Sequence, residues 1–308
     1  MWFVFALITT LSWGAADLFY KRGADENDKY SHLKTAMAVG LVMGIHAFIM
    51  LIFTDMHYNF INIVIYLPVS LMYILSMVVG YFGLKYLELS ISSPIQNSSG
   101  ALTAILCFVI LKQTMDVLSA VGVVLACAGV FVLGIIEKRE QDKAENEQSD
   151  KKYVLGFAAF MIPVIYCIID ALGTFFDAYY LDDISKTPFI DVTEETFENV
   201  ANTSYELTFF IMAVCIFVFL KIKKQKITLV AQRDRTAAAV FETAGQITYV
   251  FALSGNGIVA APMISSYCIV SLILSRIFLG EKLTPKKTAA VCTVIAGIII
   301  MGIAEGTA

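Results

Sequence analysis

Apolar and polar stretches alternate along nearly the whole chain, and the apolar stretches are long. A helix needs about 20 mostly apolar residues to cross a bilayer. The pattern predicts ten such helices, at 2–20, 33–54, 60–84, 90–111, 116–136, 153–181, 204–220, 235–253, 257–279 and 286–304. The start of the third span is the least sharply defined, because it holds Pro68 and little flanking charge. The predicted class is an all-α integral membrane protein with ten transmembrane helices, embedded in a lipid bilayer.

The composition agrees with this class. Of 308 residues, 58% are hydrophobic and 16% are charged, whereas soluble domains carry about a quarter charged residues. The net charge of −4 gives no reason to expect a nucleic-acid partner. All six cysteines lie in apolar stretches without CxxC or Cys/His spacing, so we expect free thiols, no metal site and no cofactor. Residues 1–20 lack the basic start and the cleavage site of a signal peptide and are predicted to be the first span.

The basic residues predict an orientation, because Lys and Arg concentrate in cytoplasmic loops. With the loops numbered along the chain, the odd-numbered ones hold 19 Lys and Arg residues and the even-numbered ones only Lys112 and Lys186. We therefore expect a multi-pass protein of the plasma membrane with both termini outside. The longest even-numbered loop, 182–203, is rich in Asp and Glu. It is interpreted as a solvated outer cap or as a vestibule that attracts cations.

An internal repeat divides the chain. Shifting the sequence by 168 residues aligns the fourth and fifth spans with the ninth and tenth without a gap. The identities include Pro94/Pro262, Ser98/Ser266, Gly129/Gly297, Gly134/Gly302 and Glu137/Glu305, with Tyr81/Tyr249 one helix earlier. Because each copy holds five spans, the copies must insert in opposite directions, as in many secondary transporters. We predict a five-helix repeat at 1–137, a polar cytoplasmic linker at 138–152 and a second five-helix repeat at 153–308.

The repeated segments resemble a known family. The segments 81–134 and 249–302 look like the closing halves of EamA-like repeats, with GEKLT at 280–284 as the most specific part. The opening ITTLSWGAADLFYKR at 8–22 resembles the first helix of that family. The chain is thus similar to members of the drug/metabolite transporter superfamily over nearly its full length. The resemblance implies ten helices, a central cavity and alternating access, and it does not specify a substrate. The first repeat departs from the pattern, with Lys112-Gln113-Thr114 in place of Gly280-Glu281-Lys282.

Acidic side chains inside the predicted spans are the first candidates for chemistry, because ionisable groups in a membrane are costly and normally face a cavity. Asp17 has Trp13 four residues before it and Lys21 four residues after it. It is either half of an ion pair with Lys21 or a coupling or gating residue, and both interpretations stay open. Asp170 follows Tyr166 with the same spacing, and Thr174 and Asp177 continue its helix face, with Asp177 expected at the outer interface. We predict that Asp17 and Asp170 are repeat-related gates on opposite sides of the membrane midplane.

A polar face on the eighth span is the preferred substrate site. Glu242 is followed by Gln246 at i+4 and Tyr249 at i+7, which predicts one shared helix face. The first repeat has the apolar Ile74 and Val78 in place of Glu242 and Gln246. Such asymmetry is what a site for one substrate requires, although an interhelical hydrogen bond of purely structural importance is the alternative. A buried glutamate at this position would also suit proton coupling.

Polar residues follow the paired prolines of the fourth and ninth spans. Proline frees a backbone carbonyl that a nearby polar group or a ligand can engage. We predict that Gln96, Asn97 and Tyr267 face a substrate cavity. Trp13 and Tyr166, four residues before the two aspartates, are predicted to bind the substrate as well. The neighbouring serines are equally compatible with close helix packing.

These features favour a secondary active transporter for a small polar or cationic metabolite such as an amine, an amino acid or a drug-like molecule. The spans hold acidic groups but no deep unpaired Lys or Arg, which disfavours anionic substrates. A lipid-linked-substrate enzyme would need a clustered catalytic constellation, and no such motif occurs, so we expect no enzyme activity. A non-transporting membrane scaffold is the other alternative. We expect a monomer or a homodimer, with a proton as a further partner.

Overall fold

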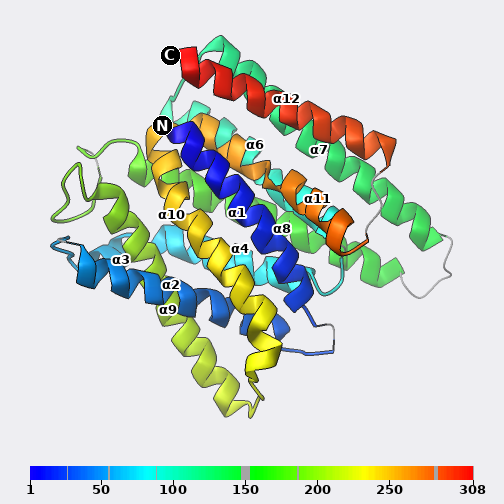
Figure 1. The fold of residues 1–308 in the computed structure, drawn as a ribbon, viewed down its shortest axis with the longest axis horizontal. Helices are drawn as coiled ribbons and strands as arrows, with labels where there is room; N and C mark the ends of the chain where they lie inside the picture. The colour runs from blue at the N-terminus through cyan, green and yellow to red at the C-terminus, as the bar shows by residue number, and fades with distance from the viewer. Residues whose placement is uncertain are drawn as a thin grey trace.

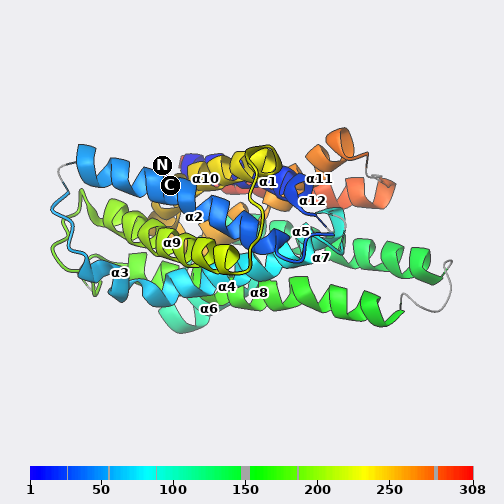
Figure 2. The same cartoon turned by 90° about the horizontal axis from the view of Figure 1, so that it is seen from below.

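The computed structural model describes residues 1–25, 27–54, 56–87, 89–146, 153–185, 187–280 and 284–307. All regular structure in these ranges is helical, with no strand. Figures 1 and 2 show an elongated bundle whose helices run roughly along one long axis. The all-α class is confirmed for the described part of the chain.

The first half of the chain forms seven α-helices and one π-helical turn: α1 (Trp2–Gly23), α2 (Ser31–Phe53), α3 (Ile61–Ile65), α4 (Leu67–Gly83), α5 (Leu89–Asn97), α6 (Ser99–Leu106), η1 (Cys107–Leu111) and α7 (Val117–Asn146). The second half forms α8 (Tyr153–Leu181), α9 (Phe197–Ile222), α10 (Leu229–Ser265), α11 (Tyr267–Phe278) and α12 (Pro285–Thr307). Helix α7 continues to Asn146, into the segment that we predicted as a linker. The rest of that segment, 147–152, lies outside the described residues.

Length and hydropathy give eight candidate membrane-spanning helices among the described residues, not ten. One candidate, Gln232–Phe278, has 47 residues, which is about twice what one crossing of the bilayer needs. Asn256 inside it has non-helical backbone angles (φ −167°, ψ 76°) and lies in the gap expected between two spans. The shorter apolar helix α4 has 17 residues. Helix length and hydropathy therefore do not establish ten crossings.

The paired prolines interrupt two helices in the same way. Ser98 Oγ donates to the carbonyl of Pro94 at 3.1 Å, and Ser266 Oγ donates to the carbonyl of Pro262 at 3.1 Å. In both cases the helix ends just before that serine, at Asn97 in α5 and at Ser265 in α10. The third predicted span is also divided, because α3 and α4 meet at Tyr66.

Four helix pairs build most of the bundle: α1 with α10, α4 with α8, α2 with α9, and α7 with α12. The α7–α12 pair packs through small residues on both sides. A Cβ atom on Gly129 would lie 3.1 Å from the Ala290 carbonyl, and one on Gly297 would lie 2.6 Å from the Gly122 carbonyl. Such close backbone approach is typical of helices packed in a membrane.

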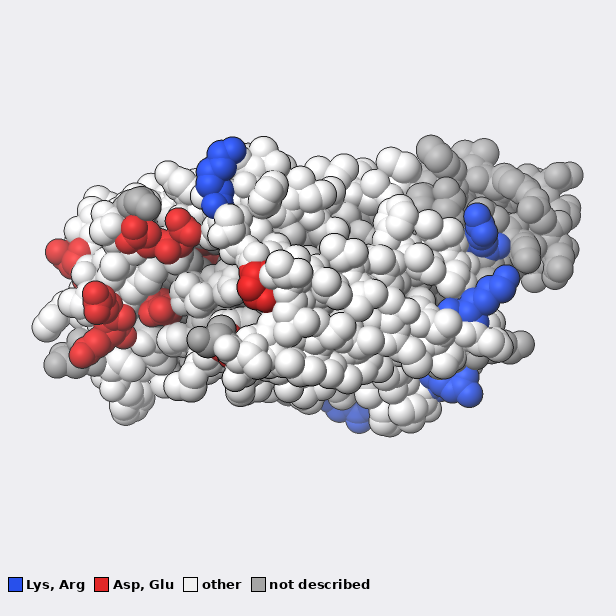
Figure 3. Space-filling model, turned by 90° about the horizontal axis from the view of Figure 1, so that it is seen from above, with Lys and Arg blue, Asp and Glu red and all other residues white. Residues whose placement is uncertain are grey.

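Basic and acidic side chains gather at opposite ends of the long axis. Figure 3 shows Lys and Arg gathered mainly at one end and most of the Asp and Glu residues at the other, with an almost uncharged surface between them. Large apolar side chains such as Ile45, Ile52 and Phe131 are exposed on the surface. An uncharged apolar belt of this kind suits contact with lipid.

Candidate functional site

A cavity lies among α1, α4, α5, α8, α9, α10 and α11. The free space inside it is about 50 Å³, which is enough for a few water molecules, so the side chains of its wall lie close together in this structure. Nine of the ten residues that we predicted for the site line it. They are Trp13, Asp17, Gln96, Asn97, Tyr166, Asp170, Glu242, Tyr249 and Tyr267.

Gln246 is the predicted residue that the cavity lining does not include. It is buried, with 2% of its surface exposed, but it does not line the cavity. The helical repeat explains the difference, because seven residues fall about 20° short of two full turns, whereas four residues overshoot one turn by about 40°. Glu242 and Tyr249 therefore face the cavity together, and Gln246 lies to one side of them.

Each cavity carboxyl group is hydrogen-bonded to hydroxyl groups. Asp17 Oδ2 accepts from Ser93 Oγ and from Ser271 Oγ, each at 2.7 Å. These two serines come from α5 and α11, so Asp17 of α1 joins three helices. Lys21 Nζ donates to the carbonyls of Leu84 and Leu87, each at 2.8 Å.

The other two carboxyl groups have similar surroundings. Asp170 Oδ2 accepts from Ser99 Oγ at 2.8 Å. Glu242 Oε2 accepts from the Tyr20 hydroxyl at 3.1 Å. The backbone carbonyl of Glu242 accepts from Trp13 Nε1 at 3.2 Å, which fixes the indole beside the carboxylate.

Aromatic rings form much of the remaining wall. The Trp13 ring lies 5.0 Å from Tyr249 and 5.9 Å from Tyr267, measured between ring centroids. The Tyr73 hydroxyl is hydrogen-bonded to the Tyr249 hydroxyl and donates to Thr174 Oγ1 at 2.9 Å. Aromatic faces attract cations, so the rings and the carboxyl groups favour the same sign of ligand charge.

The cavity is acidic as a whole. Its lining contains Asp17, Asp170 and Glu242, and among the described residues that line it there is no Lys, Arg or His. The described part of the chain also holds no group of three or more His, Cys, Asp or Glu residues that could bind a metal ion. The arrangement can therefore bind a small cation, or a zwitterion through its ammonium group, by contacts with carboxylates and aromatic rings.

The structure adds cavity residues that the sequence interpretation missed. Tyr20, Tyr73 and Tyr205 line the cavity and are buried. Tyr20 follows Asp17 by three residues and Trp13 by seven, so the helical spacing was a usable signal for it. Tyr205 has no other described cavity residue at helical spacing on α9, so the sequence around it did not indicate a place in the site.

Asp177 lies deeper than its sequence position suggests. As the third acidic or polar residue on the Asp170 face of α8, it was expected near the outer interface, yet it is fully buried. The Tyr66 hydroxyl donates to Oδ1, and Oδ2 has no hydrogen-bond partner among the described residues. The rings of Tyr180 and Phe189 pack against Tyr66, at 5.4 and 5.2 Å, and these rings together keep water from Asp177.

A second pair of titratable groups lies between α2 and α9, outside the cavity lining. His46 Nδ1 is 2.7 Å from Glu206 Oε2 and 2.9 Å from Oε1. Glu206 is fully buried. The sequence alone did not indicate this pair, because the two residues lie 160 positions apart.

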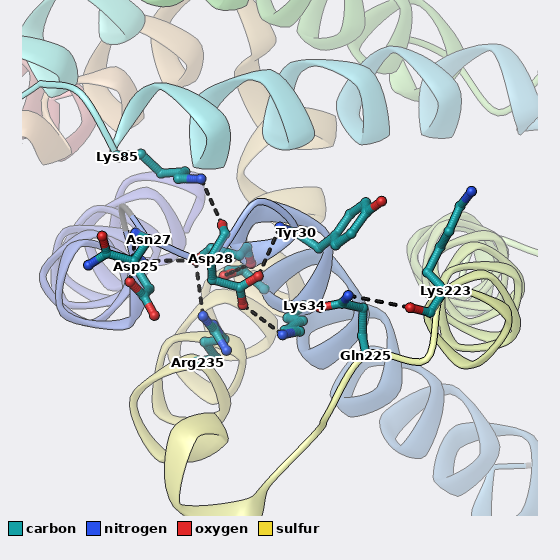
Figure 4. Close-up of polar contacts among 11 residues, drawn as sticks. Asp25, Asn27, Asp28, Tyr30, Lys34, Lys85, Lys223, Gln225 and Arg235 are labelled. Atoms are coloured by element: carbon teal, nitrogen blue, oxygen red, sulfur yellow. Dashed lines mark hydrogen bonds and ion pairs between the residues drawn. The ribbon is translucent and has the colours of Figure 1, made fainter.

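A polar network joins several elements at the end of the molecule where Lys and Arg gather (Figure 4). Asp28, in the α1–α2 loop, binds Lys34 Nζ at 2.7 Å, and its backbone carbonyl accepts from Lys85 Nζ at 2.7 Å. Arg235 of α10 donates to Ser31 Oγ of α2 at 3.0 Å. We call these residues the Asp28 network, and it connects the ends of α1, α2, α4 and α10.

The Asp28 network predicts a pH-dependent contribution to stability. Burial raises the pKa of Asp28, but hydrogen bonds from Lys34 and Tyr30 and the charges of Lys34 and Arg235 outweigh it, so the pKa lies below its ordinary 3.8. A lowered pKa stabilises the folded state above the unfolded pKa, and the gain is lost as pH falls through the folded value. We expect Asp28→Asn to lower the melting temperature by roughly 2–4 °C at pH 7.

The measurement is thermal unfolding of both proteins in detergent between pH 3 and pH 8. The difference between them should shrink below about pH 4, where wild-type Asp28 begins to lose its charge. Asp25→Asn is the matched control, because the Asp25 carboxylate accepts the Asn27 backbone N–H of its own loop. A difference that stays constant down to pH 3 would contradict the role given to the Asp28 charge.

Comparison with known proteins identifies the family. The model of the EamA-like transporter family matches residues 1–135 and 185–303, which is most of the chain. The chain belongs to this family. It is therefore a membrane protein of a transporter family within the drug/metabolite transporter superfamily, and the family members are transporters and not enzymes.

The fold also recurs among solved structures. One, described only as a crystal structure of a protein, matches with a TM-score of 0.64 over 98% of this chain and 96% of the other chain. The sequence identity is 12%, so this likeness shows the fold alone. The comparison with curated proteins finds no match.

Proposed function

We propose that this EamA-like protein is a secondary active transporter that moves a small polar or cationic metabolite across the plasma membrane by alternating access. The observation that carries the proposal is the cavity itself. Three carboxyl groups, a tryptophan and several tyrosines converge there from six helices, with no basic side chain among the described lining residues. Amines, amino acids and drug-like cations carry the positive charge that such a wall favours.

The architecture that we propose has ten crossings in two inverted five-helix repeats. Three observations support it. Interchanging the two halves turns the α1–α10 contact into the α4–α8 contact. The α2–α9 and α7–α12 contacts each join a helix to its own repeat equivalent. The Gly129–Ala290 and Gly122–Gly297 contacts are exchanged by the same operation. The two proline breaks also correspond.

The proposed orientation has both termini outside. It rests on the 19 Lys and Arg residues in the odd-numbered loops and on the separation of charge seen in Figure 3. The end of the molecule that holds the Asp28 network would then face the cytoplasm. The acidic α8–α9 loop would face outward.

In the proposed mechanism Glu242 is the main ligand for the substrate cation. Its carboxylate is bound by one neutral hydroxyl, from Tyr20, which leaves capacity for an ammonium group. Trp13, Tyr249 and Tyr267 provide the aromatic faces around that group. Asp17 and Asp170 act as gating or coupling residues in this mechanism, and a proton held by these carboxyls would exchange with the substrate charge.

Alternating access requires contacts at each end that open in turn. At the basic end, Lys21 ties α1 to the end of α4, and the Asp28 network adds α2 and α10. At the acidic end, Asn62 exchanges two hydrogen bonds of 2.9 Å with the backbone of Ile190, and Ser254 binds Glu198 at 3.0 Å. We propose that these two sets of contacts break alternately during transport.

The direct test is flux in proteoliposomes. Purified protein is reconstituted, and uptake of radiolabelled amines, amino acids and organic anions is measured with and without a pH gradient. We expect saturable uptake of at least one cation or zwitterion, inhibited by others of the same charge, and no uptake of the anions. Saturable uptake restricted to anions would contradict the proposed substrate class, and absence of uptake across the whole panel would contradict transport of these metabolites.

A further inference from the structure

Asp177 is a fully buried carboxyl group with an incomplete set of hydrogen-bond partners. It lies four residues before the end of α8, which is about 6 Å along the helix axis. The Tyr66 hydroxyl donates to Oδ1, whereas Oδ2 has no partner among the described residues. Asp170 and Thr174 on the same helix face line the central cavity, and Asp177 does not. It is therefore a separate acidic group between the cavity and the acidic end of the molecule.

The groups that face Asp177 are tyrosine hydroxyls and aromatic rings. In the described part of the chain, no Lys, Arg or His side chain acts on its carboxyl group. A charge on this group would act on hydroxyls at the start of α4, within α4, on α9 and on α10, which belong to Tyr66, Tyr73, Tyr205 and Tyr249. His46, on the neighbouring helix α2, is bound to Glu206 instead.

These surroundings favour the carboxylic acid over the carboxylate. A buried carboxylate needs several donors or a cation to replace the hydration that it loses. Among the described residues, one neutral donor reaches Asp177. A carboxylic acid loses less hydration, and its carbonyl oxygen can accept from the Tyr66 hydroxyl. In this arrangement the proton lies on Oδ2, the oxygen without a partner.

The Tyr66–Asp177 contact helps to close the acidic end. It joins the start of α4 to α8, and the Tyr180 hydroxyl of α8 donates to the Ile65 carbonyl at 3.0 Å beside it. The 153-residue shift that relates Asp17 to Asp170 aligns Asp177 with Ala24. The first repeat thus has no acidic counterpart, so the frame that the two halves share does not require this carboxyl group.

We propose that Asp177 is a proton-binding residue whose proton is released when the acidic end opens. This inference rests on the proposed function and assigns it a coupling proton outside the central cavity. While the end is closed, the proton stays on Oδ2 and Tyr66 stays bound to Oδ1. When the rings of Tyr66, Tyr180 and Phe189 separate, water reaches the carboxyl group, accepts the proton as hydronium and hydrates the carboxylate. Closing the end again requires a proton to return from water to the carboxylate.

Infrared spectroscopy of the full-length protein in liposomes measures this proton directly. A carboxylic acid has a C=O stretching band at a higher frequency than the amide and carboxylate bands. Exposed carboxyl groups are ionised above about pH 6, so the band that remains there comes from buried acids. We expect wild type to lose part of this band between about pH 6 and about pH 9, and Asp177→Asn to lack that part.

Two further variants make the infrared result specific. Glu206→Gln is the matched control, because Glu206 is also fully buried but is bound to His46. It should keep the pH-sensitive band. Tyr66→Phe removes the hydrogen bond to Oδ1 and leaves the carboxyl group in place, so it should shift the frequency of the band without abolishing it. This variant tests the assignment even if Asp177→Asn does not fold.

Hydrogen exchange of the backbone tests the link to opening. The reporters are peptides that cover 61–66 and 187–197, at the acidic end. After correction for the pH dependence of intrinsic exchange, raising the pH from about 6 to about 9 should speed their exchange at least about fivefold in wild type and Glu206→Gln. In Asp177→Asn the exchange should not change with pH. His57, in the α2–α3 loop, is present in all these proteins and cannot cause a difference between them.

The possible outcomes lead to different conclusions. A wild type without the pH-sensitive band, or the same pH response of exchange in wild type and Asp177→Asn, would overturn the proposal. Loss of the band when NaCl replaces KCl at constant pH would overturn it in favour of a sodium site. Neither measurement uses a substrate. If both effects are present and no metabolite of the panel is taken up, the proposed transport function fails and the proton site stands.

Discussion

Glu242→Gln is expected to lower substrate flux by at least about thirtyfold, because removing one partner of a buried charge contact costs about 2 kcal/mol or more. Glutamine keeps the size and hydrogen-bonding capacity of glutamate but cannot attract a cation by charge. The Tyr20 hydroxyl and the Trp13 indole, which contact Glu242, can remain in place. Flux is measured in proteoliposomes at equal protein content, with the half-saturating concentration determined separately from the maximal rate.

Glu206→Gln is the matched control for this prediction. Glu206 is also a buried glutamate, but it binds His46 and does not line the cavity. Its replacement should lower thermal stability while leaving the half-saturating concentration unchanged. Equal flux in Glu242→Gln and wild type would remove Glu242 from the site, and an equal loss in both glutamine variants would indicate a structural effect.

Gly297→Leu is expected to have the largest effect on stability. A Cβ atom at this position would lie 2.6 Å from the Gly122 carbonyl and 2.8 Å from the Ala126 nitrogen. Both are backbone atoms of α7, so the new side chain can fit only if α7 and α12 move apart. Overpacking of this kind costs about 3 kcal/mol, and we expect the melting temperature to fall by roughly 6–12 °C.

The control lies on the same helix. A Cβ atom on Gly306 would meet no atom within 4 Å, so Gly306→Leu should change the melting temperature by less than about 2 °C. Thermal unfolding in detergent, followed by a tryptophan or thiol-reactive fluorophore, compares the two variants. A similar small change in both would show that the α7–α12 contact contributes little to stability.

The sequence was sufficient to predict the parts of this molecule that depend on hydropathy and on helical period. Membrane-spanning helices are long apolar segments, so α1, α2 and α8 begin and end within a few residues of the predicted spans. Of the predicted face of α10, Glu242 and Tyr249 line the cavity and Gln246 does not. The helix ends just before Ser98 and Ser266 were not predicted, because the paired prolines were interpreted only as freeing backbone carbonyls.

Other features depend on distances that no local pattern encodes. His46 and Glu206 meet because α2 packs on α9, and neither residue has a charged neighbour on its own helix to signal the pairing. Hydropathy alone also placed Asp177 too close to the surface, because its burial depends on aromatic rings from α4 and the α8–α9 loop.

The reciprocal contact between α7 and α12 has a consequence for how such a protein can change over time. Were the two halves separate, identical chains, every substitution at this contact would occur twice, once on each side of the axis. In the proposed inverted repeat, fusion into one chain removes that constraint, because Gly122 faces Gly297 while its counterpart Ala290 faces Gly129. Each half can then acquire its own residues, as Ile74 in the first half and Glu242 in the second illustrate. A duplicated protein can in this way keep a symmetric frame and still differ between its two sides.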